Sequence, residues 1–139
     1  MKRSMNSALA ALAITVSLAA PAPAHDAERE SVTPKFAQAI GNIPGKIMRV
    51  VEVDYAPGAA SVAHTHAPSA FVYAYVLSGE VESKVNDGDI RRYKAGDSWF
   101  EVPGAIHAVS RNASETAPAK LLAVFVVDSS ETKLTTSVK

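Results

Sequence analysis

The sequence predicts an all-β fold made of short antiparallel strands. Three observations support this prediction: runs of β-branched and aromatic residues, turn signals at intervals of about 8–12 residues, and no helical periodicity after residue 24. About six to eight such strands are typical of a β-sandwich or a β-barrel. The chain has 139 residues, which is enough for one domain of this kind.

The first 24 residues are organised like a secretory signal peptide. Lys2 and Arg3 form a basic start, residues 8–20 form an apolar run, and Ala22-Pro23-Ala24 has the small-residue pattern of a cleavage site. A membrane anchor, the alternative, needs a longer apolar run. We therefore expect cleavage after Ala24, no stable membrane insertion of the cleaved chain, and a periplasmic or secreted protein.

The composition restricts both the partners and the sources of stability. The 14 basic residues balance the 14 acidic ones, and no basic cluster stands out, which argues against nucleic acid as a partner. The chain has no cysteine, so an exported form has no disulfides to hold it together. Its stability must come from a packed core, with a bound metal as a second source.

The mature chain is expected to begin with an arm and to continue as a barrel. Residues 25–46 are polar or interrupted by Pro and Gly, which indicates an arm outside the main body. Residues 47–127 contain the strand patterns, and residues 128–139 form a polar tail that we expect to be frayed. The expected strands are 47–55, 61–66, 71–77, 80–85, 90–94, 98–102, 106–111 and 121–127.

The residue patterns of individual strands support these assignments. Residues 80–85 alternate charged with apolar or small side chains, as a strand with one solvated face does. Asn86-Asp87-Gly88 is a strong turn signal after it. Residues 121–127 are almost continuously apolar, and residues 71–77 mix aromatic with branched side chains. We expect most of these aromatic residues to pack in the sheet, and Trp99 or Phe100 to line a cavity.

Two of the four histidines are spaced as metal ligands on a strand. His64 and His66 lie two residues apart, so an extended backbone directs both imidazoles to the same face. His107 comes late in the chain, near the start of another expected strand, and strands far apart in sequence can face each other in a barrel. Three neutral imidazoles suit one divalent metal ion such as Fe, Zn, Mn, Cu or Ni.

These histidines and the glycines around them resemble the two motifs of small single-domain cupins of the conserved-barrel type. The matching residues are Gly58, His64, His66 and Gly79 in the first motif, and Gly96, Gly104 and His107 in the second. Pro103 is displaced by one residue in the second motif, and Asn112 comes one residue late. The resemblance covers about residues 47–127 and implies a jelly-roll β-barrel with a metal in its interior, often in a homodimer.

The resemblance fails at the family's glutamate ligand. Counted back from Gly79 this position is Val72, and counted forward from His66 it is Ala70 or Phe71, none of which can bind a metal. One interpretation is a site of three histidines only, as in cupin dioxygenases related to the acetylacetone-cleaving and cysteine-oxidising enzymes. The other is that Glu101 supplies the carboxylate, either as a fourth ligand or as a base behind the ligands. Of these two roles we favour the base.

Two kinds of function remain open from the sequence. The first is a metal-dependent dioxygenase in which Glu101 is the catalytic residue and the substrate is a small anionic or enolisable molecule. The second is a module that binds or senses a small molecule or a metal without turnover. Export favours the second, because Zn and Cu compete with Fe(II) for nitrogen ligands outside the cytoplasm.

Overall fold

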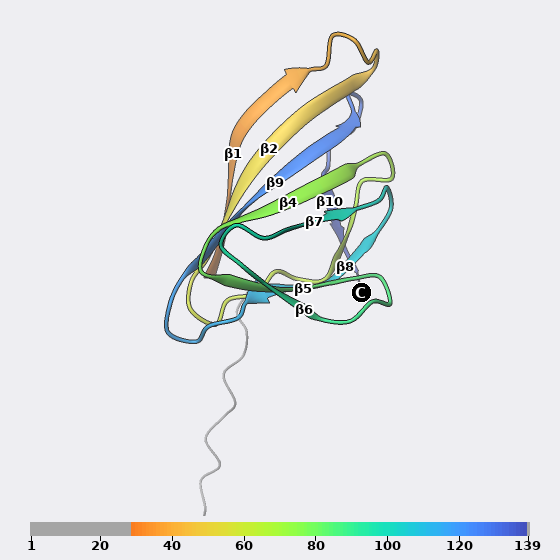
Figure 1. Ribbon diagram of the computed structural model, residues 1–139. Helices are drawn as coiled ribbons and strands as arrows, with labels where there is room; N and C mark the ends of the chain where they lie inside the picture. The colour runs from red at the N-terminus through yellow and green to blue at the C-terminus, as the bar shows by residue number, and fades with distance from the viewer. Residues whose placement is uncertain (1–28, 139) are drawn as a thin grey trace, which may run out of the picture.

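The computed structural model describes residues 29–138, so the expected signal peptide and the cleavage position at Ala24 lie outside the described residues. The chain forms two five-stranded antiparallel sheets that face each other (Figure 1). Sheet A consists, in spatial order, of β1 (Glu30–Ala39), β2 (Lys46–Tyr55), β9 (Ala119–Asp128), β4 (Phe71–Ser78) and β7 (Ser98–Glu101). Sheet B consists of β10 (Thr135–Ser137), β3 (His64–His66), β8 (Ile106–Asn112), β5 (Glu80–Val85) and β6 (Arg91–Lys94).

The predicted all-β fold is confirmed, and residues 29–138 contain no α-helix. No helix in this part of the chain is long and apolar enough to cross a membrane. Each of the eight expected strands is present, with ends that differ by a few residues. The largest difference is β3, which is limited to three residues, His64–His66.

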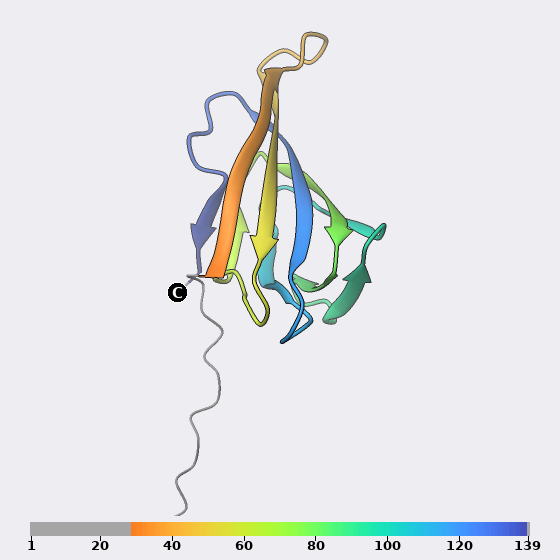
Figure 2. The same cartoon turned by 90° about the vertical axis from the view of Figure 1, so that its left-hand side faces the viewer.

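Two further strands come from the segments expected to be an arm and a tail. Residues 30–39 pair with β2 as β1, and Thr135–Ser137 pair with β3 as β10. Both additional strands lie at the edges of their sheets, and they are largely exposed. Their sequences lack a clear apolar pattern because little of their surface is buried. The β1–β2 hairpin extends beyond the other strands (Figure 2).

Alternation of side chains along β4 and β9 builds the core between the sheets. On β4, Val72, Ala74 and Val76 are buried, while the residues between them are exposed. Leu121, Ala123, Phe125 and Val127 of β9 point to the same side and are also buried. Burial of these side chains stabilises the fold at about 25 cal/mol per Å² of apolar surface.

Two positions fix the loops beside the core. Gly79 adopts a φ of 70°, and a Cβ there would lie 2.5 Å from the backbone oxygen of Pro118. Only glycine meets both requirements without strain. The buried Asn112 amide donates to the backbone oxygens of Ala56 (3.0 Å) and Ala117 (2.8 Å), and its oxygen accepts from the Ser114 N–H (2.9 Å). Asn112 therefore holds the loop between β8 and β9 in place.

Candidate metal centre

Three histidines converge because β3 and β8 are adjacent antiparallel strands. His64 and His107 are direct Cα partners in this pairing, and His66 projects to the same side as His64 from two residues further along β3. The ring centroids lie 4.9 Å apart for His64–His66, 5.2 Å for His64–His107 and 5.9 Å for His66–His107. One donor nitrogen from each ring lies within 4.8 Å of the others. The three histidines expected from the sequence thus form a group that could hold a metal ion.

Glu101 reaches the same group from the opposite sheet. It is the last residue of β7 and its side chain is only 1% exposed. Its Oε2 lies 2.8 Å from His66 Nε2, and its Oε1 lies 3.3 Å from His107 Nδ1. Trp99 Nε1 donates a hydrogen bond to Oε1 at 3.1 Å. The carboxylate is therefore fixed beside two of the three imidazoles.

The short contact between Glu101 and His66 joins two buried polar groups. Although Oε2 and Nε2 are 2.8 Å apart, both atoms, and His66 Nδ1 as well, are buried without a hydrogen-bond partner. Buried polar atoms without partners are rare in folded proteins, because each carries a desolvation penalty of about 1–3 kcal/mol. Two electron-pair donors at this separation fit a cation between them. The residues present therefore fit a divalent metal.

Contacts behind the histidines orient two of the rings. His64 Nδ1 lies 2.7 Å from the Val62 carbonyl oxygen, which can only accept, so Nδ1 carries the proton and Nε2 keeps its lone pair. Ser83 Oγ lies 2.8 Å from His107 Nε2. Ser83 is a contributor that sequence reasoning missed, because only the β5–β8 register places it against His107. Such partners fix ring orientation and tune the affinity of a metal site.

The surroundings favour the neutral form of His64 and His107 and the ionised form of Glu101. Burial lowers the pKa of His107 to about 4 and also lowers the pKa of His64. Burial alone would raise the pKa of Glu101, but its contacts with His66, His107 and Trp99 outweigh this effect and lower it. Imidazoles bind metals in the neutral form, so the donor set is ready for a cation near neutral pH.

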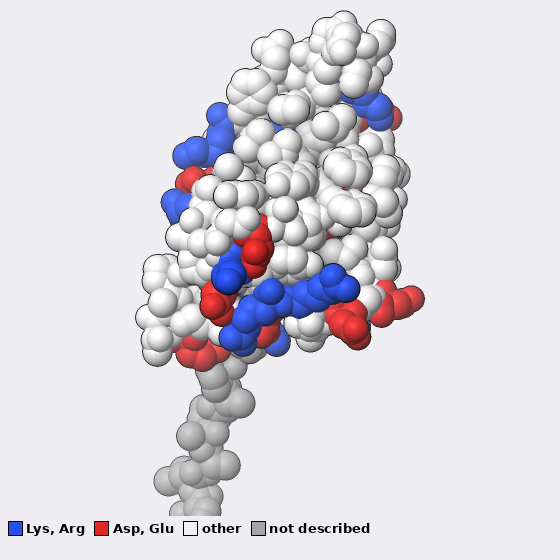
Figure 3. Space-filling view, viewed as in Figure 1, with Lys and Arg blue, Asp and Glu red and all other residues white. Residues whose placement is uncertain are grey.

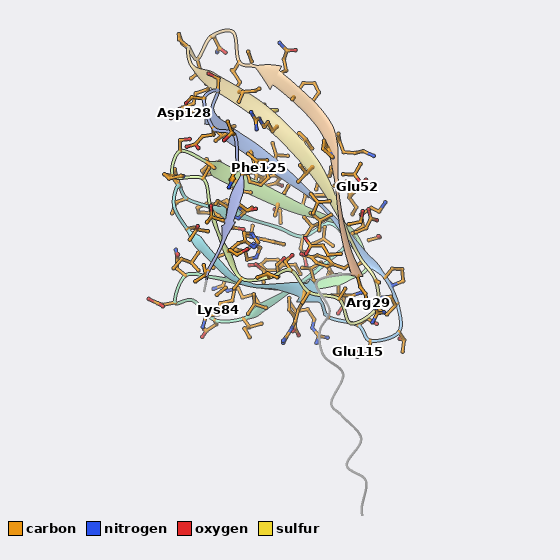
Figure 4. All side chains as sticks on the ribbon, turned by 180° about the vertical axis from the view of Figure 1, so that it is seen from behind. Arg29, Glu52, Lys84, Glu115, Phe125 and Asp128 are labelled. Carbon is orange, nitrogen blue, oxygen red and sulfur yellow. The ribbon has the colours of Figure 1, made fainter. Side chains whose placement is uncertain are left out.

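The group lies in a cavity of about 300 Å³ between the sheets. Phe125 of β9 packs edge-on against His66 with ring centroids 5.4 Å apart, and lies among the interior side chains in Figure 4. Among the described residues that line the cavity there is no Lys or Arg, and the acidic ones are Glu30 and Glu101. The other lining residues are mainly aliphatic or aromatic, with hydroxyl groups from Tyr55, Ser61 and Ser110.

The strand register places a carboxylate beside the position where the first motif lacks its glutamate. Val72 on β4 and Glu101 on β7 are direct Cα partners across adjacent antiparallel strands. Glu101 therefore enters the cavity next to the position where the first motif lacks its glutamate. Trp99 shares this inward direction and lines the cavity, whereas Phe100 points outward and is 62% exposed. Of the two aromatic candidates, Trp99 is thus the cavity residue.

Comparisons with known proteins identify the fold. The profile of the cupin domain family, described as "Cupin domain", matches residues 51–125. An uncharacterised conserved protein with a double-stranded β-helix domain from Klebsiella pneumoniae is similar in structure (TM-score 0.62, 21% identity, 80% of this chain and 85% of that one). The protein TT1209 from Thermus thermophilus is 30% identical, with a TM-score of 0.57 over 76% of this chain and 90% of that one.

An enzyme is also among the similar structures. Oxalate oxidase has a TM-score of 0.56 and 22% identity over 71% of this chain, which spans only 51% of the enzyme. At this identity the likeness concerns the fold alone. No curated protein sequence matches the chain.

Proposed function

This chain belongs to the cupin domain family, and on that premise we propose that it is a metal-dependent enzyme of the dioxygenase type, acting on a small monoanionic substrate that chelates the metal. The observation that supports this proposal is the convergence of three imidazoles and an unpartnered carboxylate oxygen in one cavity. Bound there, a divalent metal would supply Lewis-acid chemistry and, if it is redox-active, electron transfer.

His64, His66 and His107 would hold the metal, and we assign Glu101 as the fourth donor. Two donors about 2.1 Å from one metal ion lie roughly 2.9–3.4 Å apart. The Glu101 oxygens lie 2.8 Å from His66 Nε2 and 3.3 Å from His107 Nδ1, close to this range. A base placed behind the ligands, the role that the sequence alone favours, would instead contact a ring nitrogen that does not hold the metal. The two distances to the imidazole nitrogens support a donor.

Charge balance supports a monoanionic substrate. A divalent cation and the Glu101 carboxylate leave a net charge of about +1 at the ligands, and Glu30, the other acidic residue that lines the cavity, adds no positive charge to it. No Lys or Arg lines the described part of the cavity, so nothing else there offsets a second negative charge. Because uncompensated charge is costly in an apolar cavity, one anionic group on the substrate fits and two do not. The aliphatic walls favour an apolar body, and about 300 Å³ is at the small end for ligand sites.

Within this site the chain itself positions and shields the reactants. Trp99 holds the Glu101 carboxylate through Oε1, and Ser83 holds the His107 ring. Phe125 covers one side of His66 and limits the entry of water from that direction. A small anion could thus bind beside the metal in a largely apolar environment, where electrostatic interactions are stronger than in water.

The metal content and oxygen uptake of the protein test this function. Protein purified from its native compartment should contain one metal ion per chain. With iron bound, it should consume oxygen when offered acetylacetone or a catechol. Zinc or no metal, together with no turnover on iron reconstitution, would refute the dioxygenase. Tight binding of such an anion without turnover would then support a non-catalytic binding or sensing module.

We also propose that the protein acts in the periplasm or outside the cell. The signal-peptide pattern of residues 1–24 supports this localisation. Mass spectrometry of the N-terminal peptide from the exported protein should identify His25 as its first residue. Recovery of the protein only in the cytoplasm, with Met1 or Lys2 still present, would exclude it.

A further inference from the structure

A second cavity opens at the side of the molecule where β6 and β7 end the two sheets. β7 is the last strand of sheet A and β6 is the last strand of sheet B, so each has one edge without a neighbouring strand. Residues of β5, β6, β7 and the turn before β6 line a groove of about 410 Å³ there, which we call the edge groove. Of the described residues, Trp99 alone lines both this groove and the metal cavity. The edge groove is thus a separate space that shares one wall with the metal cavity.

The register of β5 and β6 directs two side chains of β6 toward the edge groove. Arg91 is the direct Cα partner of the buried Ser83. Directly paired residues of antiparallel strands project to the same face of a sheet, so Arg91 projects to the inner side of sheet B. Tyr93 lies two residues further along β6 and shares this direction. Its ring packs against Trp99 of β7, with ring centroids 4.5 Å apart.

Two charged side chains of the edge groove are available to a ligand. Arg91 and Asp89 both line it, and within residues 29–138 neither side chain forms an ion pair or a hydrogen bond. Arg92, on the outer face, is already paired, because its guanidinium lies 3.4 Å from Glu80 Oε2 and 2.9 Å from Glu82 Oε1. Figure 3 shows the basic side chains gathered along β6, with acidic ones beside them. Two residues of chain span at most about 7 Å, so one small molecule can contact both Asp89 and Arg91.

Aromatic and polar groups lie side by side in the edge groove. Tyr93 and Trp99 supply ring surface, on which a further ring can pack at an offset or edge-on. Ser83 lines the same space, is 3% exposed, and its Oγ lies 2.8 Å from His107 Nε2. Its hydroxyl lies on the strand that pairs with Arg91, so the polar part of a ligand fits beside these two residues. A volume of about 410 Å³ is within the range of small-molecule sites.

We propose that the edge groove binds a small aromatic amino acid as a zwitterion. Arg91 would hold the carboxylate, Asp89 would hold the ammonium group, and the ring would pack against Trp99 and Tyr93. Charge complementarity selects this class of ligand. A carboxylate without an ammonium group would leave Asp89 facing a like charge, and an amine without a carboxylate would do the same to Arg91. The proposal does not rest on the enzymatic function, because no metal ligand lines the edge groove.

Fluorescence titration with L-phenylalanine tests this site, because Trp99 is the only tryptophan in the chain. Selective excitation of Trp99 should give a saturable change with a dissociation constant of about 1 mM, as expected for a ligand of this size. 3-Phenylpropionate and phenethylamine each lack one of the two charges and should bind about tenfold more weakly. Alanine lacks the ring and should give no saturable change. The same dissociation constant for phenylalanine is expected after treatment of the protein with a chelator.

Matched variants locate the bound molecule. Arg91→Gln and Asp89→Asn should each weaken phenylalanine binding about tenfold. Arg92→Gln and Asp87→Asn change the charge in the same way at neighbouring residues that do not line the edge groove, so they should bind as wild type does. Circular dichroism and thermal unfolding should show that all four variants remain folded.

Three results would overturn the proposal. The first is the absence of a saturable change up to about 20 mM phenylalanine, well above the expected dissociation constant. The second is an equal loss of binding in Arg92→Gln and Arg91→Gln, or equally tight binding of 3-phenylpropionate and phenylalanine. The third is binding that disappears with the chelator, which would place the amino acid on the metal instead. A failure of oxygen uptake, by contrast, would leave the binding result unchanged.

Discussion

Glu101→Gln should separate the stability of the metal complex from that of the metal-free protein. Gln keeps the shape of the side chain and removes its negative charge. In the metal-free protein, Glu101 is a buried carboxylate whose nearest polar neighbours are two imidazoles and an indole N–H. No Lys or Arg lines the described cavity to compensate it. Because contacts with His66, His107 and Trp99 hold the pKa of Glu101 below its ordinary value, the ionised carboxylate contributes some stability at neutral pH. The metal-free variant should therefore unfold at the same temperature as wild type or slightly lower.

The metal complex should be affected much more strongly than the metal-free protein. Because Oε2 lies 2.8 Å from His66 Nε2, a metal about 2.1 Å from that nitrogen is at most about 5 Å from the carboxylate oxygen. Coulomb attraction between charges of +2 and −1 at this separation is roughly 7 kcal/mol with an effective dielectric constant of 20. Much of this energy is offset by desolvation, and outer contacts alone are worth 10- to 100-fold in affinity. We therefore expect at least 100-fold weaker metal binding.

Competition titration with a chelator measures the metal affinity, and differential scanning calorimetry without metal measures stability. The matched rescue is Glu101→Gln combined with Val72→Glu, which moves the carboxylate to its cross-strand partner. This double variant should recover at least tenfold of the lost affinity. If Glu101→Gln binds metal within threefold of wild type, Glu101 is not a donor. If such a variant keeps its metal but loses turnover, the carboxylate acts as a base.

Three further predictions concern stability. Unfolding of the metal-free protein by urea should become easier as the pH falls, because the His107 pKa drops from 6.5 in the unfolded chain to about 4 in the fold. As the pH falls, the unfolded chain takes up a proton on His107 before the folded protein does. The free energy of unfolding should therefore decrease by about 3 kcal/mol between pH 6.5 and about pH 4. A flat profile, or one that His107→Gln leaves unchanged, would contradict this assignment. Asn112→Ala removes two hydrogen bonds to the loop after β8 and one to Ala56 after β2, and it should lower the free energy of unfolding in urea by about 3 kcal/mol, with metal affinity unchanged. A change below 1 kcal/mol would show that these loops do not depend on Asn112. Gly79→Ala should lower the free energy of unfolding by about 3 kcal/mol or more, because Gly79 has a positive φ and the Pro118 oxygen lies close to the position of the added Cβ. Gly41→Ala is the control and should be nearly neutral, because a Cβ at Gly41 would have no atom within 4 Å.

Local patterns were sufficient to predict the central strands and the histidine group. The alternation in β4 and β5 and the apolar run of β9 reflect burial that the structure confirms. His64 and His66 could be placed on one face because a strand has a period of two residues. His107 was added because distant strands can face each other in a barrel, and the resemblance to the cupin motifs supported it, since spacing within the chain does not determine which strands become neighbours.

Features that depend on register or on edge position could not be predicted in the same way. Glu101 is 29 residues from Val72 in sequence, and only the β4–β7 pairing shows that one faces the other. β1 and β10 bury too little apolar surface to leave a pattern, because each has a neighbour on one side only. The sequence did not distinguish Trp99 from Phe100 as the cavity residue. The alternation of side chains along β7 buries Trp99 and exposes Phe100.

The last strand of the chain connects the C-terminal end to the metal ligands. β3 has only three residues, and β10 pairs with all of them, including Thr135 with His66 and Ser137 with His64. Backbone hydrogen bonds from Ala67 N–H to Leu134 O and from Val138 N–H to Ala63 O, both 2.9 Å, extend this contact. A metal ion held by His64 and His66 would thus stabilise the pairing of β10 with β3. Hydrogen exchange at the amides of Ala67 and Val138 should slow as the site fills, so these two amides can report its occupancy.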